Sequence, residues 1–321
     1  MKKIIAALAG GAILAASTLA GAQAYPHKTI KIIVPFAVGG IADTFGRVVA
    51  QKLTDSWGQP VVVENKTGAG GNIGADLVAK SPADGYTLVV GNIGSHAVNP
   101  FLMKNMPYDP LRDFTPIAHL LDAEGLLVVH PDVPVKSVPE LIAYAKANPG
   151  KLAYASGGMG TTSHLAGELF KSIAKVDIMH VPYKGNSPAI TDVMGNQAQM
   201  IFATMPTVIQ QAKSGRLRAI GTLGTTRAAA TPDVPTIAES LPGFDVANWI
   251  GLFGPPHLPR EIAVKLNAEV QKIMQTPEVQ KRMEVEGAKF IPTTPESFAA
   301  FQKAESVKWG KAIQEAGIKQ E

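Results

Sequence analysis

Short apolar runs alternate along the chain with longer segments whose apolar residues recur every three or four positions. Residues 29–35 are β-branched and apolar, which predicts a buried strand. The spacing then becomes helical, and one stripe contains Phe45, Val48, Val49, Leu53 and Trp57. The alternation continues through further strands at 61–64 and 86–90, which indicates βαβ units and a mostly parallel sheet.

A glycine turn joins the first predicted strand to its helix. Gly39 and Gly40 permit a positive φ and a close approach of the backbone to a ligand. Asp43 or Thr44 is suited to cap the helix that follows. The backbone N–H groups at such a junction point at one place and attract an anion. Because the lysine of a nucleotide-binding P-loop is absent, we expect a small carboxylate at this turn.

A second glycine turn of this kind lies near the middle of the chain. It follows the short strand 152–155 and precedes a helical stripe that contains Leu165 and Leu169. Its glycine and polar positions include Ser156, Gly158, Thr161 and His164. Either turn alone is typical of an ordinary connection between a strand and a helix. The pair predicts two lobes that face each other across a binding cleft.

Three further candidate contacts lie beyond two other predicted strands. Ser95 and His96 follow the strand 86–90, at the edge where open α/β sheets bind ligands. A neighbouring serine and histidine can equally form a turn with a hydrogen-bonded structural histidine. Tyr183 lies in the turn after the strand 177–181 and is also a candidate for ligand binding.

The chain is expected to cross between the two lobes twice, near 122–125 and 244–253. The helices predicted from residue 259 onward have only the first sheet to pack against. The first lobe is therefore expected to be discontinuous, with residues 25–123 and 248–321, and the second lobe to contain residues 124–247.

Composition and charge narrow the possible functions. Two lysines precede an apolar run at 4–20 and small residues before Ala24, which is typical of a secretory signal (residues 1–24) cleaved after Ala24. No later stretch is long and apolar enough to span a bilayer. The net charge of +4 includes the two signal lysines, and the other basic residues are scattered, so we expect no nucleic-acid partner. An exported chain without cysteine fits a bacterial periplasm.

Six motifs occur in a specific order from about residue 29 to the C-terminus. They are Val34-Pro35-Phe36-x-x-Gly39-Gly40-x-x-Asp43, Val62-Val63-Glu64-Asn65-Lys66-x-Gly68-Ala69-Gly70-Gly71-Asn72-Ile73-Gly74, Pro82-x-Asp84-Gly85-Tyr86-Thr87-Leu88, Ser156-x-Gly158-x-Gly160-x-x-x-His164-Leu165-Ala166-Gly167-Glu168, His180-Val181-Pro182-Tyr183-Lys184-Gly185 and Pro232-Asp233-Val234-Pro235-Thr236. In order and spacing they resemble those of the tripartite tricarboxylate transporter receptors, also called the Bug family. The resemblance implies a two-lobed α/β fold of the periplasmic-binding-protein (Venus-flytrap) kind, each lobe a mostly parallel sheet flanked by helices. It also implies a receptor that captures a small carboxylate and delivers it to membrane permease subunits.

The resemblance also implies which residues contact the ligand. The carboxylate would be held, partly through ordered waters, by Phe36, Gly39, Asp43, Ser156, Thr161 and His164. Many relatives carry an aspartate after the phenylalanine at position 202, where this chain has Ala203. An aspartate there would suit an ammonium group, so Ala203 favours a dicarboxylate or an aromatic carboxylate over an amino acid. Ile41 beside the glycines makes the rim more apolar and would admit a longer aliphatic or aromatic body.

An exported hydrolase is the alternative from another functional class. The chain contains no Gly-x-Ser-x-Gly motif, no His-Glu-x-x-His motif and no cysteine nucleophile. A Ser/His pair assembled in space from Ser95 or Ser163 could still act on a carboxylate ester. We expect a monomeric receptor without catalytic activity, cofactor or metal.

Overall fold

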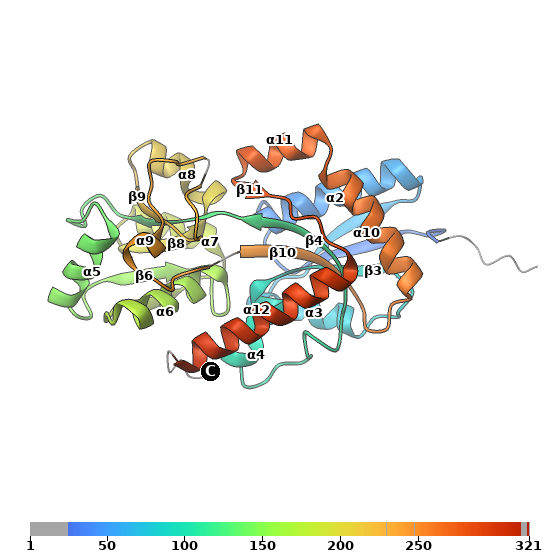
Figure 1. Cartoon of the computed structure of the whole chain (residues 1–321), viewed down its shortest axis with the longest axis horizontal. Helices are drawn as coiled ribbons and strands as arrows, with labels where there is room; N and C mark the ends of the chain where they lie inside the picture. Colours follow the sequence, from blue (N-terminus) through green and yellow to red (C-terminus); the bar gives the residue numbers. More distant parts are fainter. Residues whose placement is uncertain (1–24, 229, 247, 316–319, 321) are drawn as a thin grey trace, which may run out of the picture.

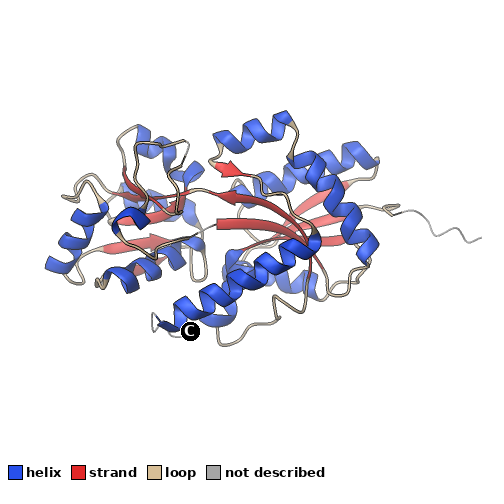
Figure 2. Cartoon of the chain, viewed as in Figure 1, coloured by secondary structure: helices blue, strands red, loops and turns tan. Residues whose placement is uncertain are grey.

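Two β-sheets, each flanked by helices, lie side by side in the computed structural model, which describes residues 25–228, 230–246, 248–315 and 320 (Figures 1 and 2). The predicted secretory signal lies outside the described residues. Each sheet with its helices is called a lobe below, and the lobe that contains the first strand is the first lobe.

The first lobe is built on a six-stranded sheet with the order β11-β4-β10-β3-β1-β2. Its strands are β1 (Ile30–Val34), β2 (Val61–Asn65), β3 (Thr87–Asn92), β4 (Thr115–Ala123), β10 (Asn248–Gly254) and β11 (Ala288–Lys289). Its helical segments are α2 (Ile41–Trp57), η2 (Ala69–Gly71), α3 (Asn72–Ala79), η3 (Gly94–Val98), α4 (Asn99–Leu102), α10 (Arg260–Met274), α11 (Pro277–Val285) and α12 (Pro295–Glu315). Both ends of the described chain therefore contribute to this lobe.

The second lobe is built on a five-stranded sheet with the order β7-β6-β8-β5-β9. Its strands are β5 (Gly125–Val129), β6 (Ala153–Ser156), β7 (Met179–Pro182), β8 (Met200–Thr204) and β9 (Arg218–Thr222). Its helices are α5 (Val138–Ala147), α6 (Thr162–Ala174), α7 (Asn186–Met194), α8 (Met205–Lys213) and α9 (Ile237–Ser240).

Both sheets are mixed, whereas the sequence pattern predicts mostly parallel ones. The strands β1, β2 and β3 pair in parallel, as do β6, β7 and β8. The antiparallel pairs involve the strands at the crossings: β10 with β3 and β4, β11 with β4, and β5 with β8 and β9. A single residue, Glu124, separates β4 of one sheet from β5 of the other. The chain thus leaves the first sheet along one strand and returns along a strand of opposite direction.

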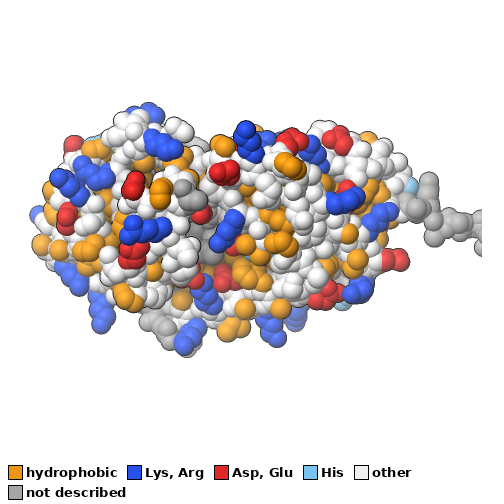
Figure 3. Space-filling view, turned by 45° about the horizontal axis from the view of Figure 1, so that its top comes forward, with side chains coloured by type: hydrophobic (Ala, Val, Ile, Leu, Met, Phe, Trp, Pro, Cys, Tyr) orange, Lys and Arg blue, Asp and Glu red, His pale blue; other side chains and the backbone are white. Residues whose placement is uncertain are grey.

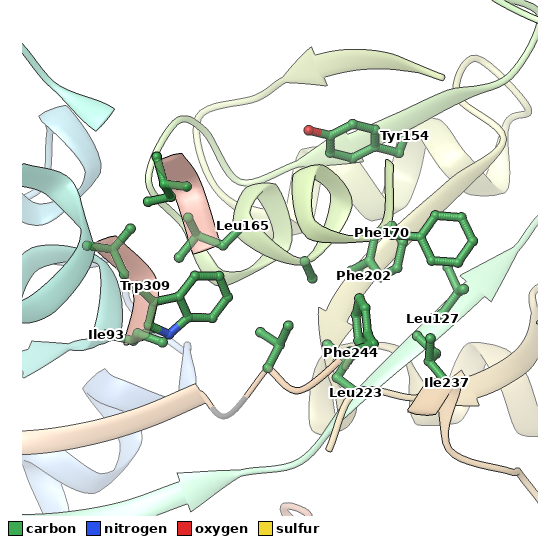
Figure 4. Packing of buried hydrophobic residues seen from close by; sticks show 14 of the residues in the cluster. Ile93, Leu127, Tyr154, Leu165, Phe170, Phe202, Leu223, Ile237, Phe244 and Trp309 are labelled. Atoms are coloured by element: carbon green, nitrogen blue, oxygen red, sulfur yellow. The ribbon is translucent and has the colours of Figure 1, made fainter. Parts of the chain in front are cut away.

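One apolar cluster contains buried residues of both lobes. It includes Phe253 and Phe298 of the first lobe and Phe170 and Phe202 of the second. In Figure 4, Trp309 of α12 lies beside Ile93 of the first lobe and close to Leu165 of the second, and all three belong to this cluster. Since burial of apolar surface is the main source of stability, α12 stabilises the arrangement of the two lobes as well as its own packing.

The surface carries both signs of charge. On the face drawn in Figure 3, Lys and Arg side chains are interspersed with Asp and Glu over both lobes. Every helix among the described residues is too short or too polar to cross a bilayer.

The lobes also meet through two glycines that leave no room for side chains. A Cβ placed on Gly94, after β3, would lie 2.3 Å from the carbonyl oxygen of Gly160 in the second lobe. A Cβ placed on Gly160 would in turn lie 2.2 Å from Oδ1 of Asn99. Such distances are shorter than any non-bonded contact, so the closeness of the lobes depends on these glycines.

We predict that Gly94→Ala forces the lobes apart. Overpacking of a tight contact costs about 1–3 kcal/mol, which should appear as a lower urea midpoint. The matched control is Gly195→Ala at the exposed end of α7, where a Cβ would make only an ordinary contact of 3.6 Å with Thr191. Equal midpoints for the two variants would contradict the prediction.

Candidate functional site

The parallel strands of both sheets end on the sides where the lobes face each other. β1 and β3 end at the Gly39 turn and at Gly94, and β6 ends at the second glycine turn, which contains Gly160. Ligands of open α/β sheets bind beyond such strand ends. The two glycine turns singled out by the sequence therefore lie at the junction between the lobes.

The first turn has its positive φ at Gly39 (+83°), whereas Gly40 is extended, with a φ of −76°. The expectation of a positive φ is therefore wrong for Gly40. Gly40 is also the N-cap of α2, so the prediction that Asp43 or Thr44 caps this helix is wrong. The helix begins earlier because an extended glycine already satisfies the conformation that an N-cap requires.

The buried carboxylate of Asp43 holds this turn in place. It accepts hydrogen bonds from the Gly39 N–H (3.0 Å), from Nε of Arg47 (3.0 Å) and from Nδ2 of Asn65 (2.8 Å). Burial on its own would raise the pKa of Asp43, but the bonds from Arg47, Gly39 and Asn65 outweigh it and lower the pKa. Asn65 also donates to the carbonyl of Phe36 (3.0 Å). Asp43 thus positions the turn through its backbone.

The second turn uses most of its N–H donors internally. The N–H of Gly157 donates to Oγ of Ser163 (2.9 Å), and that of Gly158 donates to Oγ of Ser156 (3.1 Å). The N–H of Gly160 donates to Nδ1 of His164 (3.2 Å).

The helix that follows this turn is capped as well. Oγ1 of Thr161 accepts from the backbone N–H of His164 at the start of α6 (3.4 Å). The polar atoms of Ser156, Thr161 and His164 therefore hold the turn and the helix end together, and this use of them is visible only in three dimensions.

Two histidines pack under the second turn. The rings of His164 and His180 have centroids 4.5 Å apart, and Nε2 of His180 lies 2.6 Å from Oγ of Ser156. Burial, reinforced by the nearby His180, lowers the pKa of His164 to about 4. Burial also lowers the pKa of His180. Both rings are therefore neutral at pH 7.

Ser95 and His96 lie in the core of the first lobe. Both are fully buried, and Oγ of Ser95 is 2.9 Å from Nδ1 of His96. The imidazole stacks on Phe253 with 4.0 Å between centroids, and burial lowers the pKa of His96 to about 3. Ser95 and His96 therefore match the second of the two alternatives, a hydrogen-bonded structural histidine. A pair so inaccessible and so weakly basic is poorly suited to the nucleophile and general base of a hydrolase.

Tyr183 and Ala203 are also engaged within the second lobe. The hydroxyl of Tyr183 donates to Oδ2 of Asp192 (2.7 Å), and burial together with this carboxylate raises the pKa of Tyr183 to about 12. Ala203 is buried in β8 opposite Leu126. It packs in an apolar cluster of the second lobe and is not among the residues that line the pocket described next.

A pocket of about 370 Å³ lies between the lobes. Gly39 lines it from the turn before α2 and Ile41 from the start of α2. Ser187 lines it from the first turn of α7 and Thr207 from the first turn of α8. None of these three described helices has a side-chain cap. Their first turns therefore lack the side-chain acceptor that Thr161 gives to α6, although the N–H of Met205 in α8 donates to the backbone carbonyl of Glu124. The three helices place the positive ends of their dipoles around one pocket.

This pocket includes residues that the sequence patterns did not single out. Gly185 immediately precedes α7, and Pro206 is the second residue of α8. The sequence thus contained a glycine signal for the start of α7 and a proline signal for the start of α8. Glu286 also lines the pocket, and no local signal could have placed it there. Among the described residues, no group of three or more His, Asp or Glu side chains could hold a metal ion.

We predict different effects of alanine at the two glycines of the first turn. Gly39→Ala should lower the free energy of unfolding by about 1–2 kcal/mol, because an L-residue is strained at positive φ. Gly40→Ala should cost much less, since its φ is ordinary and a Cβ would lie 3.5 Å from the Ala37 carbonyl oxygen. Urea unfolding of both variants measures the difference. A larger loss for Gly40→Ala would refute this description of the turn.

The buried His164 should make stability depend on pH. Its pKa is about 4 in the folded chain and about 6.5 when exposed, so the unfolded state binds more protons between these values. The free energy of unfolding should therefore fall as the pH decreases from about 6.5 to 4, by on the order of 3 kcal/mol from this group. His164→Asn keeps an acceptor for Gly160 and does not titrate, so its pH profile should be flatter. Parallel profiles would contradict the assignment.

Comparison with known proteins gives one consistent result. Residues 45–318 match the family described as "Tripartite tricarboxylate transporter family receptor". The chain is 38% identical to Protein BugT of Bordetella pertussis over 300 residues, which cover 93% of this chain and 92% of BugT.

Solved structures agree with this assignment. Rpa4515 of R. palustris, solved with adipate, is 34% identical with a TM-score of 0.88, and the match covers 92% of this chain and all of that one. MatC of Rhodopseudomonas palustris, solved with bound malate, is 32% identical with a TM-score of 0.84, covering 90% of this chain and all of MatC. The resemblance inferred from the six motifs and the two-lobed fold are thereby confirmed. The chain belongs to the tripartite tricarboxylate transporter receptors, the Bug family of solute-binding proteins.

Proposed function

We propose that this receptor captures a small carboxylate in the pocket between its lobes and delivers it to the permease subunits of a tripartite transporter. The observation that carries the proposal is the meeting of three uncapped helix N-termini, those of α2, α7 and α8, at one pocket. A carboxylate is the acceptor that such donors and dipoles favour. Adipate and malate in the related structures are ligands of the same chemistry.

The proposed contacts come mainly from the backbone. The turn at Gly39 and Gly40 leads directly into the open N-terminus of α2. Gly158, with a φ of +116°, shapes the facing turn of the second lobe. The N–H of Gly185, the residue before α7, donates to the carbonyl of Gly157 (3.0 Å) and so fixes the start of α7 next to that turn. Ordered waters would bridge those donors that the ligand does not reach.

We propose that the side chains of the remaining candidates act indirectly. Asp43 holds the first turn, while Ser156, Thr161 and His164 hold the second. Phe36, whose ring packs against the backbone at Gly71, borders the first turn. Losing any of these would displace N–H donors without removing a ligand contact.

We propose the ligand class from position 203 in β8, which lies outside the pocket lining. Ala203 provides no carboxylate for an α-ammonium group, so dicarboxylates and aromatic carboxylates should be preferred over matched α-amino acids. We further propose that the mature receptor begins after Ala24, acts in the periplasm and is a monomer that uses no cofactor.

A thermal-shift screen tests the proposal. Succinate against aspartate, glutarate against glutamate, and benzoate provide matched comparisons. A ligand at 100 times its Kd should raise the free energy of unfolding by about 2.7 kcal/mol, and in both pairs the acid without the amino group should give the larger shift.

Two further readouts separate a receptor from an enzyme. Small-angle scattering should show a smaller radius of gyration at saturation, as expected for closure about a hinge. NMR of the bound acid after prolonged incubation should recover it unchanged. Preference for the amino acid in both pairs, or turnover of the ligand, would overturn the proposal.

A further inference from the structure

Glu286 brings a carboxylate from the first lobe into the pocket between the lobes. It lies between α11 and β11 and lines the pocket together with residues of α7 and α8. Its backbone is fixed by the neighbouring Gly287, whose carbonyl accepts from the N–H of Glu124 (2.8 Å). The carbonyl of Glu124 accepts in turn from the N–H of Met205 at the start of α8 (2.8 Å). Glu286 is thus held at the place where the chain crosses between lobes.

The negative charge of Glu286 is uncompensated within the part of the chain that the structure describes, which supplies no ion-pair partner for it. The other residues that line the pocket are glycine, apolar residues or neutral polar residues, without Lys, Arg or His. A single charge in a partly enclosed pocket acts on a ligand more strongly than it would on an open surface.

Two of the three hydroxyl groups that line the pocket are already used as donors. Thr207 donates to the carbonyl of Thr204 (2.7 Å), and Thr191 donates to the carbonyl of Ser187 (3.1 Å). Oε1 of Gln211, also in the lining, is buried without a hydrogen-bond partner. Away from the helix N-termini, the pocket therefore offers the unpaired acceptor of Gln211 and the negative charge of Glu286.

Apolar side chains form much of the remaining wall: Ile41, Ile190, Met194 and Pro206. These side chains fit a hydrocarbon body and make no hydrogen bond to a charged group.

We propose that Glu286 determines ligand charge, so that this receptor takes a monocarboxylate with an apolar body whose far end is neutral or donates a hydrogen bond. The inference rests on the proposed function, because it presumes that the helix N-termini hold one carboxylate. A second carboxylate would lie close to Glu286, and like charges brought together in a binding site cost affinity.

Ligands with the same chain and different far ends test this inference. Hexanoate, adipate and 6-aminohexanoate share six carbons, and benzoate and terephthalate form an aromatic pair. By calorimetry, the wild-type protein should bind each monocarboxylate about tenfold more tightly than its dicarboxylate partner. 6-Aminohexanoate should bind at least as tightly as hexanoate.

Glu286→Gln removes the charge and keeps the shape. It should reduce the preference to about twofold, because loss of the like-charge interaction strengthens dicarboxylate binding more than hexanoate binding. Glu284→Gln is the matched control, because Glu284 is an exposed acid of α11 outside the pocket lining and should leave the ratio as in the wild type.

The outcomes separate the two proposals. If carboxylates bind but the wild-type protein prefers the dicarboxylate, or Glu286→Gln leaves the ratio unchanged, the inference is wrong and the proposed function stands. If none of these acids nor those of the thermal-shift screen binds, both are wrong. The wild-type ratio is informative even if Glu286→Gln fails to fold.

Discussion

Backbone N–H groups need hydrogen-bond acceptors, and the turns and helix ends between the two lobes depend on this constraint. At the second glycine turn the chain supplies these acceptors itself, through Ser156, Ser163 and His164. At the first turns of α2, α7 and α8 it supplies no side-chain cap. Because unpaired donors are costly once water is excluded, the proposed carboxylate would satisfy groups that the fold leaves open.

The open donors are useful only if their positions are fixed. Asp43 fixes the first turn with three hydrogen bonds, and the close approach of Gly94 to Gly160 sets how near the lobes come. The apolar cluster that includes Trp309 contains buried residues of both lobes and so joins them. In the proposed binding mode the site needs few charged side chains, because dipoles and N–H groups would provide the attraction and side chains such as Glu286 would select among anions.

The sequence predicted the fold class well because its signals are local and repeated. The strand–helix alternation and the first glycine turn are present in the structure. The order of the motifs pointed to the family that the comparisons show. The mixed direction of the sheets was not predictable from periodicity, since a strand looks the same whichever way it runs. The exact residue with positive φ was also misjudged, because either Gly39 or Gly40 could have adopted it.

The site itself was only partly predictable. Ser156, Thr161 and His164 lie at the junction of the lobes, but their polar atoms are used by neighbouring backbone groups, and no sequence pattern reveals such pairing. Ser95 and His96 belong to a buried core. Glu286 reaches the pocket from a segment about 250 residues away from Gly39, so only the fold brings the two together.

The central claim is that the N–H groups at the starts of α2, α7 and α8 receive the carboxylate. NMR chemical shifts of the backbone amide protons and nitrogens test it most directly, followed while a carboxylate that binds in the thermal-shift screen is added. The account predicts that the largest downfield shifts belong to the N–H groups of Ile41, Ser187 and Thr207. It also predicts that the amides of Gly157 and Gly158, already bonded to serine hydroxyls, change little. The reverse pattern, with large shifts only in the second glycine turn, would contradict the account.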